Sequence, residues 1–115
     1  MYVTRFEQAP AYAAPGHQDM RMLRLQGREA GPAEQLWLGV SHLLPGGGTT
    51  LDASATEKMY VVLDGEVVVS NGAEEALLGR WDSCRFAPGE ARQLSNRTNQ
   101  PATILLAMPL APPAH

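Results

Sequence analysis

The sequence predicts an all-β fold, a small barrel or sandwich built from short strands. Apolar, β-branched runs alternate with turn residues about every 8 to 12 positions, which is typical of such folds. The chain contains 11 glycines and 9 prolines among 115 residues, and they are spread too evenly for helices of ordinary length. A chain of this length is expected to form one domain with a modest core.

The first part of the chain alternates apolar segments with loops. We expect an edge strand at residues 1–6, an extended Ala- and Pro-rich arm at 8–17, a strand at 20–26, a loop at 28–34 and a strand at 36–44. Pro45 and the three glycines after it are expected to stop that last strand. The predicted domain spans 1–115, with an N-terminal arm at 1–19, a barrel at 20–108 and a flexible tail at 109–115.

Residues 46–69 contain the clearest turn signal. Two apolar runs, residues 60–63 and 66–69, are separated by Asp64-Gly65. Asp-Gly between such runs predicts a β-hairpin, because a type I′ turn needs positive φ at both central residues. Further strands are expected at 75–78, 83–86, 92–96 and 103–108, with turns at 70–72 and 98–101.

Composition and charge exclude several classes of function. The net charge is −3 with a pI near 5.5, so we expect neither nucleic acid nor an anionic membrane as a partner. No apolar run reaches the ~18 residues of a spanning helix, and the N-terminus lacks the pattern of a signal peptide. The single cysteine, Cys84, leaves no internal disulfide and fits a reducing cytoplasm.

Two spaced patterns occupy residues 46–96. The first pattern, with gaps of five, one, three and six residues, holds Gly46, Asp52, Ser54, Lys58 and Gly65. The second, with gaps of five, one, two and three residues, holds Trp81, Ala87, Gly89, Arg92 and Asn96. This spacing resembles the two motifs of the cupins, small β-barrels with a ligand or metal pocket in the barrel mouth. The resemblance implies a small cupin-type β-barrel, a jelly-roll-like double-stranded β-helix.

The resemblance also implies four metal-ligand positions, which in cupins hold three histidines and a glutamate. Here they hold Asp52, Ser54, Lys58 and Arg92. Metal sites draw on clustered histidines and carboxylates, and two cations would repel the ion. The only plausible ligand pair is Asp52 with His42, joined by Glu57 if its strand carries a bulge. We therefore expect degenerate motifs, with no metal and no other cofactor.

Strand alternation puts Lys58 and Tyr60 on one face of their strand and residues 59, 61 and 63 on the other. If the resemblance holds, the Lys58 face looks into the barrel. The outer face is also apolar, and contiguous exposed apolar surface usually marks an interface. The charged fraction, 18% against a usual ~25%, is likewise easier to explain if a partner covers some surface. We therefore expect a homodimer.

Lys58 and Arg92 would then lie in one small cavity, where a buried cation needs a partner. One interpretation is a relic site in which Asp52 or Glu57 neutralises them. A second is binding of a small anionic molecule, with the planar guanidinium of Arg92 holding a carboxylate or phosphate. In a third, burial and Arg92 lower the pKa of Lys58, which then acts as a Schiff-base nucleophile or general base.

The candidate site residues follow from these interpretations. The catalytic candidates are Lys58, His42 and Tyr60, and the ligand-binding candidates are Arg92, Asp52, Ser54 and Asn96. His42 is the best further acid or base, although a lone histidine on an apolar face is more often a core residue. Tyr60 would donate a proton to a developing oxyanion. His17 stands alone in the arm, and Trp37 is expected to pack.

The predicted function is binding of a small anionic, carboxylate-type metabolite. Its enzymatic form would be metal-independent lyase, decarboxylase or isomerase chemistry on a small carboxylate. One alternative is a binding or sensing protein without chemistry. Another is a metal-dependent cupin oxygenase or isomerase with atypical ligands.

Overall fold

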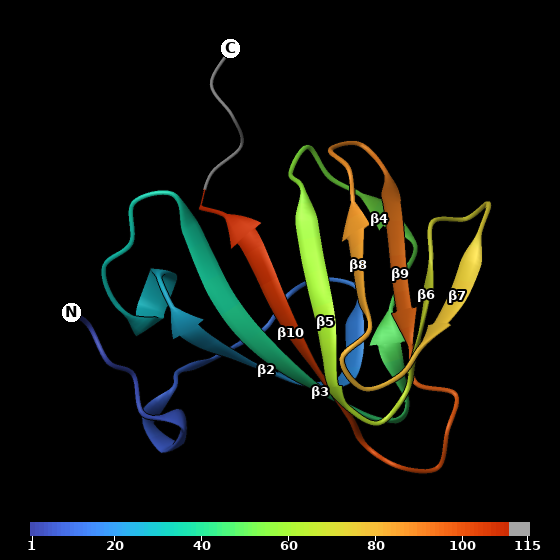
Figure 1. Ribbon diagram of the computed structural model, residues 1–115, viewed down its shortest axis with the longest axis horizontal. Helices are drawn as coiled ribbons and strands as arrows, with labels where there is room; N and C mark the ends of the chain where they lie inside the picture. Colours follow the sequence, from blue (N-terminus) through green and yellow to red (C-terminus); the bar gives the residue numbers. More distant parts are fainter. Residues whose placement is uncertain (111–115) are drawn as a thin grey trace.

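Short antiparallel strands make up most of the chain, and Figure 1 shows them wound into a barrel. The computed structural model describes residues 1–110. The strands are β1 (Ala11–Tyr12), β2 (His17–Gln26), β3 (Leu36–Thr49), β4 (Asp52–Ala53), β5 (Lys58–Asp64), β6 (Val67–Ser70), β7 (Glu75–Leu78), β8 (Ser83–Phe86), β9 (Ala91–Ser95) and β10 (Ala102–Pro109). Two 3-10 turns, η1 (Phe6–Gln8) and η2 (Arg28–Ala30), precede β1 and follow β2. The all-β prediction is confirmed.

The strands pair in the order β7-β6-β9-β3-β10-β5-β8, with β2 added to β3, β1 to β2 and β4 to β9. One wall therefore contains β2, β3, β10, β5 and β8, and the other contains β9, β6 and β7 (Figure 1). The 14-residue strand β3 joins the two walls. Its main part pairs with β2 and β10, whereas Gly48 near its end pairs with Ser95 of β9.

The hairpin predicted at Asp64-Gly65 is wrong. β5 pairs with β10 and β8, whereas β6 pairs with β7 and β9. The Asp-Gly pair instead carries the chain from one wall to the other. Gly65 has a positive φ of 76° and Asp64 does not, so the turn is not type I′. A side chain at Gly65 would also lie 2.8 Å from the carbonyl oxygen of Pro101.

Two further expectations about the strands are wrong. Pro45 and the glycines after it do not stop β3, which continues to Thr49. Gly47 instead allows the backbone of β2 to lie close, because a Cβ on it would be 2.3 Å from the carbonyl oxygen of Asp19. Residues 1–6 form no strand, and the chain there ends in the 3-10 turn η1. The other predicted strands are present within a few residues of their expected bounds, and β6 and β7 form the expected hairpin around residues 71–74.

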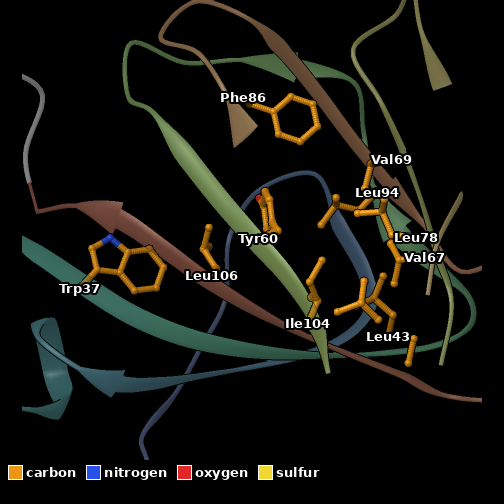
Figure 2. Packing of buried hydrophobic residues seen from close by; sticks show 12 residues of the cluster. Trp37, Leu43, Tyr60, Val67, Val69, Leu78, Phe86, Leu94, Ile104 and Leu106 are labelled. Atoms are coloured by element: carbon orange, nitrogen blue, oxygen red, sulfur yellow. The ribbon is translucent and has the colours of Figure 1, made fainter. Parts of the chain in front are cut away.

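The barrel interior is filled by twelve buried side chains, shown in Figure 2. Val62 and Ile104 are fully buried, and Tyr60 meets Phe86 edge-on with 6.1 Å between ring centroids. Along β5 the residues Lys58, Tyr60 and Val62 are buried, whereas Met59 is exposed. The inward orientation expected for Lys58 and Tyr60 is confirmed.

The end of the chain is attached to the barrel as far as it is described. The backbone N–H of Leu110 donates to the carbonyl oxygen of Gln35, at 3.0 Å. Of the predicted flexible tail, residues 111–115 lie outside the described residues. Within residues 1–110 no helix is long and apolar enough to cross a membrane.

Candidate functional site

A cavity of about 380 Å³ lies where the ends of β1, β2, β3, β5, β9 and β10 converge. Its lining combines cationic side chains, aromatic rings and small hydroxyl groups. This volume is within the usual range for sites that hold a small molecule, roughly 300 to 1,000 Å³. The cavity is therefore the candidate site.

Two cations, Lys58 of β5 and Arg92 of β9, are buried against the cavity. Lys58 is 4% exposed and Arg92 is 8% exposed. The Nε of Arg92 is buried without a hydrogen-bond partner, and neither cation forms an ion pair within residues 1–110. Unpartnered buried charge costs free energy. Arg92 therefore lines the cavity with a guanidinium that no carboxylate within residues 1–110 neutralises.

Lys58 is held by two oxygens instead of a carboxylate. Its Nζ donates to Oγ of Ser54 and, at 3.5 Å, to the carbonyl oxygen of Thr56. Burial lowers the pKa of Lys58 from its ordinary value, and the charge of Arg92 lowers it further. Each effect disfavours the ammonium form, so a neutral amine is more accessible here than on an exposed lysine.

Tyr60 lies beside these cations and is 5% exposed. Burial raises its pKa to about 12, although the nearby charge of Arg92 acts in the opposite direction. The phenol therefore remains protonated at neutral pH. It can donate a hydrogen bond to a ligand but cannot serve as a base.

A strap formed by residues 13–17 covers one side of the cavity. Its Gly16 has a φ of 71°, and its carbonyl oxygen accepts a 2.8 Å hydrogen bond from the N–H of Thr50. His17 lines the cavity, and its Nδ1 donates to the carbonyl oxygen of Pro15 at 2.8 Å. Burial lowers the pKa of His17; the Pro15 hydrogen bond opposes this effect. The strap thus contributes an imidazole to the site.

Arg24 also lines the cavity and stacks on two aromatic rings. Its guanidinium carbon is 3.5 Å from the ring centroid of Tyr12 and 4.3 Å from that of Trp37. Its Nε also donates to Glu29 at 3.2 Å. Such stacking fixes the plane of the guanidinium. Figure 2 shows Trp37 at one end of the buried cluster, with Val67 and Leu78 at the other end.

The electrostatics of the cavity oppose the net charge of the chain. Four cationic side chains line it, and no Asp or Glu is among its described lining residues: the cations are Arg24, Arg28, Lys58 and Arg92. The chain as a whole has a net charge of −3. A cavity lined by one sign of charge concentrates ligands of the opposite sign. The site therefore favours anions.

The donor set does not fit a divalent metal ion. Of the four motif positions only Asp52 supplies an ordinary metal ligand, and Lys58 and Arg92 would repel the ion. Within residues 1–110 no three His, Cys, Asp or Glu side chains are grouped so that they could hold a metal.

Four of the seven residues predicted for the site line the cavity together: Lys58, Tyr60, Ser54 and Arg92. Asp52 does not line it. Its Oδ2 accepts a 2.6 Å hydrogen bond from Oγ1 of Thr50, and the residue is exposed at the rim.

The expected position of His42 in the pocket is corrected. On β3 the inward face carries Trp37 and Leu43, which places His42 on the outer face. There its Nδ1 is hydrogen-bonded to Oγ1 of Thr103 at 3.1 Å, and Phe6 of the N-terminal segment packs edge-on against its ring. His42 therefore cannot act in the cavity with Lys58.

Asn96 is also placed apart from the cavity, in the turn before β10. It is 1% exposed, and its Nδ2 donates to the carbonyl oxygens of Leu43 and Gln100 at 3.0 and 2.7 Å. Its Oδ1 accepts from the N–H and Oγ1 of Thr98. All of its hydrogen-bonding capacity is used to organise the turn.

Sequence reasoning missed His17, Tyr12 and Arg24. These residues come from the N-terminal third of the chain, which reaches the cavity only because β1 and β2 fold back beside β3. No local spacing signals that return. Arg24 sits in a run with mixed apolar and basic residues, which is an ordinary strand pattern.

Comparison with known proteins places this architecture in a family. The cupin domain family matches residues 39–108. The chain is 46% identical over 108 residues to beta-D-galactosidase Rv1717 of Mycobacterium tuberculosis, an alignment covering 94% of this chain and 93% of that protein.

Solved structures show the same fold at lower identity. The polyketide cyclase RemF of Streptomyces resistomycificus matches with a TM-score of 0.85 and 19% identity, over 99% of this chain and 82% of that one. A sugar phosphate isomerase of the cupin superfamily from Silicibacter pomeroyi matches with a TM-score of 0.79 and 23% identity, over 94% of this chain and 75% of that one. A predicted oxalate decarboxylase from Thermotoga maritima matches with a TM-score of 0.79 and 22% identity, over 96% of this chain and 100% of that one. By the family match across most of its barrel, this chain belongs to the cupin domain family.

Proposed function

We propose that the barrel cavity binds a small anionic molecule, a carboxylate or a phosphate, through Arg92 with the help of Lys58. The observation that carries this proposal is the guanidinium of Arg92, which lines the cavity and whose buried Nε has no hydrogen-bond partner within residues 1–110. A guanidinium presents a planar pair of donors that matches a carboxylate or phosphate. An anion there would partner both buried cations at once.

The enzymatic form of this function uses Lys58 as a proton acceptor. Burial and Arg92 lower the pKa of Lys58, which favours the neutral amine that a general base requires. Tyr60, still protonated, supplies a hydrogen bond to an oxygen that gains charge. This arrangement suits proton abstraction or decarboxylation beside a bound carboxylate.

Calorimetric titration with acetate, oxalate and inorganic phosphate tests the anion site. Arg92→Gln is expected to weaken the tightest of these anions by about 10- to 100-fold, the usual value of a charge-assisted hydrogen bond. Arg97→Gln is the matched control, since Arg97 is an exposed arginine paired with Glu75 outside the cavity. Equal affinities in the wild type and the Arg92 variant, or no binding of any anion, would refute the proposal.

A second candidate function is hydrolysis of a galactoside. The 46% identity to a protein named beta-D-galactosidase, across nearly the full length of both chains, favours it. Glycoside hydrolysis usually needs two carboxyl groups across the scissile bond, and the described lining of this cavity has none. Such an activity would have to use other groups, and Lys58, Tyr60 and His17 are the ones available.

Release of nitrophenol from o-nitrophenyl-β-D-galactoside tests the second candidate. Turnover that disappears in both Lys58→Met and Tyr60→Phe would place galactoside hydrolysis in this cavity. Turnover that both variants retain would come from elsewhere or from a contaminant.

We further propose that the protein is cytoplasmic and forms a homodimer. Cys84 is a free, half-buried cysteine, which fits a reducing compartment. The outer face of β5 and β10 is apolar and only partly buried, with Met59 48% exposed. A second copy of the chain would cover it.

A further inference from the structure

We propose that Ser54 and Lys58 form a nucleophile–base pair that hydrolyses esters of small carboxylic acids. The inference rests on the proposed anion site, because Arg92 would stabilise first the oxyanion of the reaction and then the carboxylate product. It assigns a reaction and a substrate class to the cavity, and it gives Ser54 a chemical role.

The geometry of a dyad is present. Nζ of Lys58 is hydrogen-bonded to Oγ of Ser54, and that Oγ lies 3.0 Å from Oγ1 of Thr56. The N–H of Thr56 adds a longer contact to the same oxygen, at 3.4 Å. A serine hydroxyl within hydrogen-bond reach of a base that a third group orients is the arrangement of an activated nucleophile.

Ser54 is held in place by its backbone and is open to a substrate. Its carbonyl oxygen accepts a 2.7 Å hydrogen bond from the N–H of Gly89, and the preceding strand β4 pairs with β9. The residue lines the cavity and is exposed. A substrate carbonyl in the cavity can therefore reach its hydroxyl.

Lys58 is better placed to be a base than to be a structural cation. Two carboxylates lie close to it in the sequence, but both are engaged elsewhere: Asp52 with Thr50, and Glu57 with Arg85. The lysine is thus buried beside a hydroxyl and a second cation. Burial and that cation lower the pKa of Lys58, which favours the neutral amine that a base requires.

The reaction balances with water as the only co-reactant. Oγ of Ser54 attacks the ester carbonyl carbon while neutral Nζ of Lys58 takes the hydroxyl proton. The C–O π electrons move onto the carbonyl oxygen, and that oxyanion accepts a hydrogen bond from the guanidinium of Arg92. The intermediate collapses, the C–O bond to the alcohol breaks, and Lys58 returns its proton to the leaving alkoxide. Water then attacks the acyl-serine by the same steps and releases the carboxylic acid.

Labelling with a fluorophosphonate tests the dyad directly, because this reagent forms a stable adduct only with an activated hydroxyl. The full-length protein is incubated with the reagent and measured by intact mass and peptide mapping. We expect one adduct, on Ser54, and none in Ser54→Ala. Ser83→Ala, which removes an exposed serine of β8 outside the cavity, is expected to label at the wild-type rate.

Lys58→Arg separates a base from a structural cation. Arginine keeps the charge but cannot lose its proton at neutral pH. The labelling rate is expected to fall at least about 100-fold, the lower end of the usual contribution of general-base catalysis, while circular dichroism and Tm stay close to those of the wild type. A rate within threefold of the wild type, which corresponds to roughly 0.7 kcal/mol in activation free energy, would overturn the dyad. An adduct on any residue other than Ser54 would do the same.

Phosphate protection separates a failure of the dyad from a failure of the anion site. Inorganic phosphate is expected to slow labelling of Ser54 in the wild type and to have no such effect in Arg92→Gln. If phosphate binds in an Arg92-dependent way but Ser54 is never labelled, the dyad is wrong and the anion site stands. If labelling proceeds equally in Arg92→Gln and phosphate gives no protection, the anion site is wrong, and with it the role of Arg92 as oxyanion donor.

Discussion

Asp52 and Arg92 are register partners on β4 and β9, yet their side chains form no ion pair. Asp52 is turned to Thr50 at the rim, and Arg92 is buried against the cavity. Glu57, the other carboxylate that would neutralise a relic site, pairs instead with Arg85. The relic site, in which Asp52 or Glu57 would neutralise the two cations, is therefore not formed within residues 1–110. No carboxylate within residues 1–110 therefore neutralises the charge of Arg92.

Asp52→Asn tests whether that separation holds in solution. Because Asp52 is exposed and makes no ion pair with Arg92, the substitution is expected to change the free energy of unfolding by less than about 0.5 kcal/mol. Anion affinity, measured by calorimetry, should change by no more than about threefold. A loss of stability above 1 kcal/mol, about twice the usual effect of a surface substitution, would instead reveal a structural pair between Asp52 and Arg92.

Lys58→Met is expected to stabilise the fold. The substitution keeps a long side chain and removes a buried charge that has no carboxylate partner, so the free energy of unfolding should rise by about 1 kcal/mol at pH 7. Anion affinity should fall in the same variant, because the charge that destabilises the fold is also the one expected to bind the anion. Urea unfolding gives the first quantity and calorimetry the second. A variant less stable than the wild type would show that the ammonium is well solvated in the native state.

The stability of the wild type is expected to depend on pH through the same lysine. The folded pKa of Lys58 lies below its ordinary value, so between those two values the unfolded chain binds the additional proton. Stability then rises with pH through that window, and the cost of burying the ammonium is fully present below it. Lys58 is the only lysine in the chain, so reductive ¹³C-methylation gives a single lysine NMR signal, beside that of the N-terminal amine, and this signal reports its pKa. A signal titrating at or above the ordinary value of ~10.4 would contradict this expectation.

The sequence allowed the fold and half of the site to be predicted for a physical reason. Lys58 and Arg92 lie on short strands, where alternation decides which side chains point inward, and Ser54 follows directly after β4. β3 carries apolar residues on both faces, so alternation alone could not decide between the inward and outward positions of His42. The answer depends on the N-terminal segment, which covers the outer face with Phe6.

The dependence on distant contacts also explains why the hairpin predicted at Asp64-Gly65 does not form and why His17 was not predicted in the site. A turn signal is local and reports a change of direction, whereas the partner strand is chosen by contacts far away in the sequence. β5 finds β10 and β8 instead of β6. His17 enters the cavity only because β2 begins opposite the end of β3, where His17 pairs with Thr49.

Asn96→Ala should separate a structural asparagine from a ligand-binding one. The substitution removes four hydrogen bonds and leaves the buried carbonyl oxygen of Leu43 without one of its donors. We expect the free energy of unfolding to fall by about 2 to 3 kcal/mol, with anion affinity unchanged when measured well below the Tm. Weaker anion binding by a variant that is still fully folded would show that Asn96 contributes to the binding site.

Trp81→Gly is expected to raise stability. Trp81 stands where the second motif has glycine, it has a φ of 72°, and it is 70% exposed. A left-handed conformation costs a residue with a Cβ roughly 1 to 2 kcal/mol, and the exposed ring gains little from packing. Part of that cost is offset because glycine is more flexible in the unfolded chain. We expect a net gain of about 0.5 to 1 kcal/mol in urea unfolding, and a net loss would show that the indole ring has a packing role.

Val61→Glu is expected to convert a homodimer into a monomer. Val61 and Leu105 are register partners on β5 and β10, and both lie on the apolar outer face, next to the exposed Met59. A carboxylate at this position would be buried without a partner in a dimer, a cost that one copy alone would avoid. Size-exclusion chromatography with light scattering should give the mass of two chains for the wild type and one for the variant. Leu77→Glu, at an exposed apolar position on β7 of the other wall, is the matched control and should remain dimeric. A wild type that elutes with the mass of one chain at every concentration would mean that this face is not an interface between copies.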